Sequence, residues 1–179
     1  MNFDDYAAWR LANLLDNTER GIVGEYLVGT ALGCPGEGHR NWLPYDLHSA
    51  DGTAIEVKSA GRLQAWGDGA PQSPTFSVGR ATRWWDHEHG CYRGEEKQRW
   101  SRVMVFALHD WTDRGTAHPL DEKQWRFWVV PTSAIAAEFG GREGRAGIAR
   151  LERMGAVSCI WDELPTAVSL STIHEIEQE

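Results

Sequence analysis

The stretch Trp42–Gly61, WLPYDLHSADGTAIEVKSAG, decides the fold that we expect. It predicts two strands, at about 42–48 and 53–60, because an Asp-Gly turn between two apolar runs is typical of a β-hairpin. Side chains alternate along a strand, so Glu56 and Lys58 lie on the same face of the second strand. An ordinary strand would place apolar or uniformly polar residues there, and this pair therefore requires an explanation.

Asp46 lies on the first of these strands. Neighbouring strands are about 4.8 Å apart, so a suitable hairpin register brings Asp46, Glu56 and Lys58 together. Two carboxylates at that distance repel each other unless a cation lies between them. Hard divalent cations take oxygen ligands, and the Val57 carbonyl offers one more. The sequence therefore predicts an Mg²⁺ or Mn²⁺ site formed by Asp46, Glu56 and Val57. Lys58 beside it would orient or deprotonate the attacking water, or stabilise the developing negative charge.

The remaining elements follow from hydrophobic periodicity and capping signals. We expect helices at 3–15 and 19–33 and from Thr132, and strands at 75–78, 102–109 and 124–130. Asp16 is the expected cap of the second helix, and Thr132 or Ser133 that of the third. Residues 140–147 are expected to be a loop, followed by short helical pieces and a frayed acidic tail. Three glycines in the second helix indicate close packing against a neighbour: Gly21, Gly24 and Gly29.

This order predicts an α/β (α+β) fold with a mixed central β-sheet flanked by helices. The 179 residues contain no internal repeat and no second domain boundary, so we expect one domain over 1–179. A charged, Trp-containing excursion interrupts it at about 80–102.

Charge, cysteine content and apolar runs indicate which classes of protein this chain can belong to. The net charge of −8 counts against a protein that coats nucleic acid non-specifically. Three scattered cysteines predict a reducing, cytoplasmic environment, and the chain shows no signal peptide and no apolar run long enough for a membrane span. It also has no glycine-rich phosphate loop, so we expect no small-molecule cofactor.

The excursion at 80–102 offers a second kind of site. Arg80 and Arg83 are candidates for phosphate contacts, and Trp84 for stacking on a base. The alternative is a solvated region of mixed charge, since four carboxylates dilute the arginines. The segment DHEHGC (86–91) lacks the paired spacing of a zinc site, so we expect a surface loop there. The ten tryptophans belong either to the core or to base stacking.

The arrangement Asp46…Glu56-Val57-Lys58 resembles the D…(D/E)xK signature of the PD-(D/E)XK nuclease superfamily, which has the restriction-endonuclease-like fold. Pro44 departs from the pattern, because it stands two residues before Asp46 rather than directly before it. The specific match covers residues 18–60, and the second half of the chain looks like stand-alone bacterial proteins of this type.

The resemblance implies an αβββαβ core and an Mg²⁺-dependent endonuclease that hydrolyses phosphodiester bonds of DNA. It adds Glu25 as a further metal-linked carboxylate and Gln64 as a supporting active-site residue. A homodimer is implied by the resemblance alone.

Other interpretations stay open. The same fold can serve as a catalytically inactive module that binds nucleic acid or a protein partner, and the substrate can be RNA instead of DNA. Glu56 and Lys58 can belong to a solvated strand face and Asp46 to a strand end. Glu25 can be a surface residue of an amphipathic helix, and Gln64 a polar loop residue.

Overall fold

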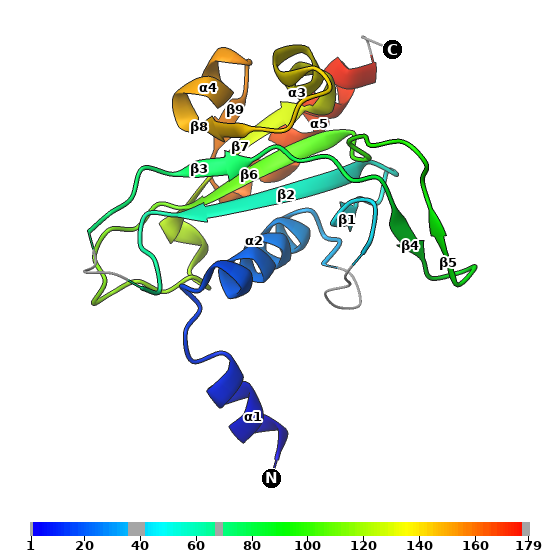
Figure 1. The fold of residues 1–179 in the computed structure, drawn as a ribbon. Helices are drawn as coiled ribbons and strands as arrows, with labels where there is room; N and C mark the ends of the chain where they lie inside the picture. Colours follow the sequence, from blue (N-terminus) through cyan, green and yellow to red (C-terminus); the bar gives the residue numbers. More distant parts are fainter. Residues whose placement is uncertain (1, 36–41, 67–69, 177–179) are drawn as a thin grey trace.

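The computed structural model describes residues 2–35, 42–66 and 70–176 (Figure 1). A mixed sheet of five strands forms the centre of an α+β fold, in the order β1-β2-β6-β7-β9. The parallel pair is β2 with β6, and the other three pairs are antiparallel. The strands are β1 (Leu47–His48), β2 (Ala54–Gly61), β6 (Val103–His109), β7 (Trp125–Pro131) and β9 (Val157–Cys159).

Two apolar clusters fill the two faces of this sheet. Helices α2 (Asn17–Ala31) and α5 (Leu164–Ile176) share one cluster with inward side chains such as Ile55 and Phe127. The opposite cluster contains residues of α3 (Thr132–Phe139) and α4 (Ile148–Arg153). Short 3-10 turns precede β7 and α5, at Glu122–Gln124 and Trp161–Glu163. Among the described residues, no helix is both long and apolar enough to cross a bilayer.

Helix α2 forms and packs as its sequence indicates. The Asp16 carboxylate caps its N-terminus, accepting from the Thr18 backbone N–H at 3.0 Å. A Cβ at Gly24 would lie far inside van der Waals contact with the Ser59 hydroxyl, so α2 lies directly on β2 at this point. Gly29 meets the backbone at Pro35, whereas Gly21 has open space around it. The expected close packing therefore holds at two of the three glycines.

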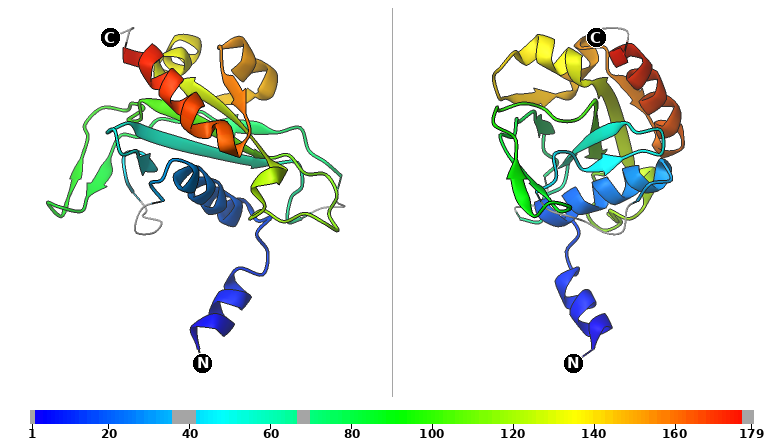
Figure 2. Two further views of the ribbon diagram at one scale, coloured as in Figure 1. Left: turned by 180° about the vertical axis from the view of Figure 1, so that it is seen from behind. Right: turned by 90° about the vertical axis from the view of Figure 1, so that its right-hand side faces the viewer.

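Helix α1 (Phe3–Arg10) is shorter than the predicted 3–15 and buries none of its residues. It extends away from the rest of the chain, as both views in Figure 2 show. The helix ends early because Asn13 uses its side chain to accept from the Leu15 backbone N–H, which stabilises a turn instead. Three aromatic side chains on it are exposed: Phe3, Tyr6 and Trp9.

Several strand predictions were wrong in extent or pairing. The first strand covers only 47–48 of the predicted 42–48. Strand β3 (Thr75–Ser77) pairs with β8 (Arg145–Gly147) in a separate sheet, so it does not extend the central one, and the predicted loop 140–147 contains β8. Strand β9 replaces one of the expected helical pieces. Strands of two or three residues carry too little alternation to be recognised, and their partners are distant in sequence.

The predicted cap of α3 was also wrong. Neither the Thr132 nor the Ser133 side chain caps this helix. Instead Ser133 donates its backbone N–H to both carboxylate oxygens of Glu175, at 3.1 and 3.0 Å, and its hydroxyl to the same group. The cap therefore comes from α5, far along the chain, where no local signal could reveal it.

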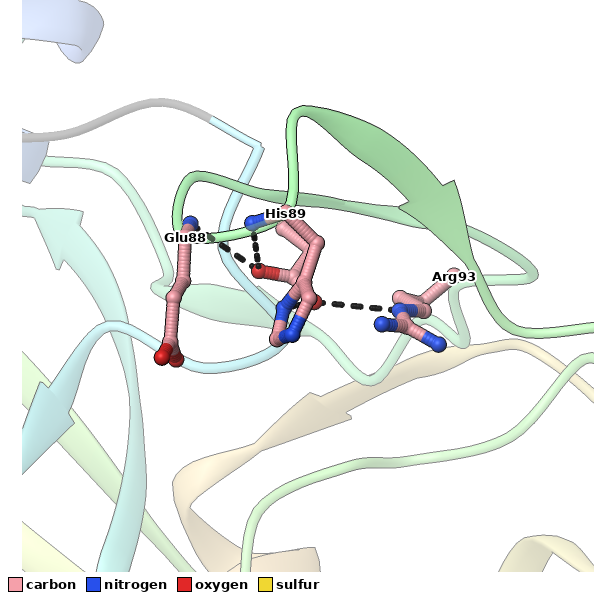
Figure 3. A network of polar contacts seen from close by, with 4 residues as sticks. Glu88, His89 and Arg93 are labelled. Atoms are coloured by element: carbon pink, nitrogen blue, oxygen red, sulfur yellow. Dashed lines mark hydrogen bonds and ion pairs between the residues drawn. The ribbon is translucent and has the colours of Figure 1, made fainter.

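The excursion at 80–102 carries the hairpin of β4 (Trp84–Asp86) and β5 (Cys91–Arg93), which extends from one end of the sheet (Figure 1). The Asp86 carboxylate organises the turn of this hairpin, and its contact residues Glu88, His89 and Arg93 are labelled in Figure 3. One oxygen accepts from the backbone of Glu88 and His89, both at 3.0 Å. The other meets the His89 ring at 2.8 Å and Arg93 Nε at 3.0 Å. The histidine-bearing turn is thus closed around a carboxylate.

Candidate active site

The β1–β2 hairpin ends in an irregular step at Asp46. Leu47 is the partner of Ile55, yet the Asp46 backbone N–H also donates to the Ile55 carbonyl, at 3.0 Å. Two successive residues therefore face one, as in a β-bulge, a device that redirects a side chain. The redirected Asp46 carboxylate accepts from the Val57 backbone N–H at 2.7 Å. The side chain thereby takes the place of the next backbone partner in the ladder.

The Val57 carbonyl faces the same edge of β2 as Asp46. In a strand, the N–H and C=O of one residue point to the same side, and the Val57 N–H points to Asp46. Strand β1 stops at Leu47, so this carbonyl lies beyond the end of the β1 ladder. Two oxygen donors of the predicted metal site are therefore neighbours.

Glu56 and Lys58 form an ion pair on the face of β2 opposite α2. Both side chains are largely buried, with exposed fractions of 22% and 28%. Burial raises the pKa of the Glu56 carboxyl, the charge of Asp46 raises it further, and Lys58 only partly offsets these effects. Burial alone would lower the pKa of Lys58, but Glu56, Asp46 and Glu25 together raise it above its ordinary value. Lys58 is therefore a stably charged ammonium among three carboxylates.

Glu25 lies on α2, on the other side of the sheet. Glu25 and Asp46 line a cavity of about 1010 Å³ between α1, α2 and β1, whereas Glu56 and Lys58 line a separate cleft. Glu25 nevertheless contributes to the charge around Lys58. In the part of the chain that the structure describes, no three His, Cys, Asp or Glu side chains form a ready metal-binding group. Asp46 and Val57 are joined by a hydrogen bond, and the charge of Asp46 acts on the Glu56 carboxyl.

The cleft at Glu56 and Lys58 has a volume of about 190 Å³ and a basic, aromatic wall. The excursion supplies that wall through Arg80, Arg99 and Trp100. Arg99 donates to the Val78 and Arg142 carbonyls, both at 3.0 Å, and its Nε is buried without a partner. Trp100 Nε1 donates to the Ala81 carbonyl at 3.1 Å.

Sequence reasoning identified only part of this wall. Arg80 lines the cleft as expected, but Arg83 is exposed outside it, and Trp84 is half-buried in the β4–β5 hairpin. Trp100 was missed, although its place between a charged run and a buried strand was a usable signal.

Gln64 lies outside the cleft at Glu56 and Lys58. Its Nε2 donates to the Gly61 carbonyl at 3.0 Å, and its Oε1 accepts from Arg20 at 3.4 Å. It lines a third cavity beyond the C-terminal end of β2. We therefore leave Gln64 out of the candidate catalytic set.

Comparison of the chain with protein-family models, curated proteins and solved structures found no match.

Proposed function

We propose that this chain is a metal-dependent phosphodiester hydrolase, an endonuclease that acts on DNA. One observation carries the proposal: the Asp46 carboxylate accepts from the Val57 backbone N–H at 2.7 Å, between Glu56 and Lys58, whose ion pair lines a cleft. A restriction-endonuclease-like core, with α2, the β1–β2 hairpin and β6 at its centre, is part of the same proposal.

The donor set fits a hard divalent cation such as Mg²⁺ or Mn²⁺. Mg²⁺ is commonly held by one or two carboxylates together with water and substrate phosphate. Asp46, Glu56 and the Val57 carbonyl would hold it, and Glu25 would act from the α2 side through water. When bound, such an ion polarises a phosphoryl oxygen and lowers the pKa of a coordinated water.

Lys58 acts by its charge. Its Nζ donates a hydrogen bond to Glu56, so the ammonium carries its proton and offers positive charge on the cleft side of the site. A fixed cation next to the reacting phosphate stabilises the negative charge that develops in the transition state. Of the roles open to this lysine, stabilisation of charge fits better than removal of a proton from water.

The wall of the cleft supports a nucleic-acid substrate. Arg80 and Arg99 supply positive charge next to Lys58, and guanidinium groups bind phosphate well. The Trp100 ring at the same cleft suits an unpaired or terminal base.

The test is cleavage of linear, nicked and single-stranded DNA by the purified chain with Mg²⁺ or Mn²⁺. We expect Lys58→Ala to lower the cleavage rate about 10²–10³-fold, the usual loss for one transition-state stabiliser. Lys123→Ala, which changes an exposed lysine of the turn before β7, is the matched control and should cut as the parent does. A Lys58→Ala protein that remains folded and cuts at the parental rate would refute the proposed role.

Two further outcomes separate the other interpretations. Cleavage of single-stranded RNA in preference to every DNA would make the chain a ribonuclease with the same residues. No cleavage of any nucleic acid, together with no heat of Mn²⁺ binding, would favour a catalytically inactive binding module. One observation favours a binding module of this kind: Glu25 and Glu56 line separate cavities.

A further inference from the structure

A third cavity, of about 580 Å³, lies between the first turn of α2, the C-terminal end of β2 and β3. In Figure 1 this is the region where the start of α2 and the tip of the β2 arrow lie close together. It shares no lining residue with the cleft at Glu56 and Lys58. The proposed hydrolysis makes no use of it.

The guanidinium of Arg20 lies in the wall of this cavity with an exposed fraction of only 3%. Its Nη1 donates to the carbonyls of Leu15 (2.8 Å) and Leu63 (3.3 Å). Its Nη2 donates to the side chains of Asn17 and Gln64. Arginine has five N–H donors, so these contacts use four. The fifth, on Nε, is buried without a partner.

The four acceptors that hold Arg20 are all neutral, so they fix the guanidinium in place without balancing its charge. Asp16 acts on it only through space, and burial outweighs that attraction. Among the described residues, the cavity is lined by a second arginine, Arg145, and by no Asp or Glu, in a chain whose net charge is −8. A buried charge normally requires a counter-charge. The cavity therefore has the electrostatics of an anion site.

Further donors converge on the same place. The Ser59 hydroxyl is buried without a partner and also lines the cavity. Because the Val57 N–H faces the edge of β2 away from β6, the N–H groups of Ser59 and Gly61 face that edge too. Arg20 lies against Gly61 so closely that a Cβ there would be 3.0 Å from the guanidinium. The absence of a side chain at Gly61 lets the guanidinium lie directly against the backbone there.

We propose that this cavity binds the phosphate group of a nucleotide, held by Arg20, Ser59 and the backbone of Gly61. A phosphate group has enough acceptor oxygens to meet several donors at once, and it pairs well with guanidinium. The Trp66 ring, exposed at the lining of the same cavity, is suited to stack on the base. The nucleotide is either free or part of a nucleic-acid strand, and both sources present the same chemistry.

Calorimetry with the full chain tests this site. The probes are inorganic phosphate, dAMP, deoxyadenosine, and a short DNA strand with and without a 5′-phosphate. We expect dAMP to bind and deoxyadenosine to bind far more weakly, because the phosphate supplies the charge. Tighter binding of the 5′-phosphorylated strand than of dAMP identifies a strand terminus as the ligand, and the reverse order identifies a free nucleotide.

Two variants locate the binding. Arg20→Gln should weaken dAMP binding about 10- to 100-fold, in the range of a lost charged hydrogen bond. Because Arg20 also ties α2 to the loop after β2, Ser59→Ala provides a second, structurally mild change. It removes a hydroxyl that has no partner and should weaken binding about 3- to 10-fold.

Lys123→Ala, which changes an exposed lysine that lines neither cavity, serves as the control and should bind dAMP as the parent does. Because the two cavities share no lining residue, phosphate binding and cleavage can fail independently. The inference is overturned if none of the phosphorylated probes binds, if deoxyadenosine binds as tightly as dAMP, or if Ser59→Ala binds dAMP with parental affinity.

Discussion

At the scale of single residues, opposing effects act on the pKa of the Glu56 carboxyl. Burial and the nearby charge of Asp46 favour its protonated form, whereas Lys58 favours the carboxylate, and the net effect is a pKa above the ordinary 4.5. The folded chain therefore holds this proton more tightly than the unfolded chain does. The contribution of Glu56 to the free energy of unfolding therefore falls as the pH rises from 4.5 through its raised pKa.

A ¹³C NMR titration of the Glu56 carboxyl in the metal-free protein measures this directly. We expect a midpoint above 4.5 in the parent chain and a lower midpoint in Asp46→Asn, because the substitution removes one negative charge next to Glu56. Glu138→Gln removes a carboxylate that pairs with Arg150 on another part of the surface, and it should leave the midpoint unchanged. A parental midpoint at or below 4.5 would contradict the geometry described for Asp46.

The core of the candidate site was predictable from the sequence, because two local rules govern it. Strand alternation places Glu56 and Lys58 on one face, and the hairpin turn returns the chain to Asp46. The bulge at Asp46 was not predictable, since it depends on how one side chain competes with the backbone for the Val57 N–H. The position of Trp100 between a charged run and a buried strand is a local signal, but long-range packing decides that Trp100 and Arg99 line the cleft.

At the scale of elements, the contact between α2 and β2 depends on a single missing side chain. Gly24 faces Ser59, and Gly21, one turn earlier in the same helix, faces open space. The two glycines share an intrinsic helix propensity about 1 kcal/mol below that of alanine. They differ only in their surroundings, and so they form a matched pair.

We expect Gly24→Ala to lower the free energy of unfolding by about 1–3 kcal/mol, because the new methyl group forces the Ser59 hydroxyl aside. Gly21→Ala should raise it by up to about 1 kcal/mol. Ser59→Ala should remove most of the penalty at Gly24, since the nearest remaining atoms would be the Cβ atoms of residue 59, at 3.4 Å, and Ala107, at 3.6 Å. Urea denaturation followed by circular dichroism measures the parent, the three single variants and the Gly24→Ala/Ser59→Ala double variant. Equal effects at the two glycines would refute the close α2–β2 contact.

At the scale of the whole molecule, one carboxylate joins the layers on the two sides of the sheet. Helix α3 belongs to one apolar cluster and α5 to the other, and Glu175 of α5 caps α3 at Ser133. The C-terminal end of α5 meets the start of α3 through the bonds between Glu175 and Ser133. Glu175 is buried, so its hydrogen bonds are shielded from water.

We expect Glu175→Ala to lower the free energy of unfolding by about 1.5–3 kcal/mol, the range for hydrogen bonds to a charged group. Glu138→Ala is the comparison, because it breaks a more exposed ion pair with Arg150 and should change stability by less than about 1 kcal/mol. Chemical denaturation of both variants provides the measurement. A loss at Glu175 no greater than that at Glu138 would show that the cap contributes little.

The parallel pairing of β2 with β6 has a consequence for the order of folding. Parallel strands need a long crossover, usually a helix, and here the described part of the crossover consists of β3 and the β4–β5 hairpin instead. The β1–β2 hairpin can form within microseconds from local contacts, whereas β6 must first close a long and largely non-helical loop. Asp46 and Glu56 therefore come together early. The segment that carries Arg80 and Trp100 takes its place only when the slower loop between β2 and β6 has closed. During that interval the nascent chain has its pair of acids in place without the cleft around them.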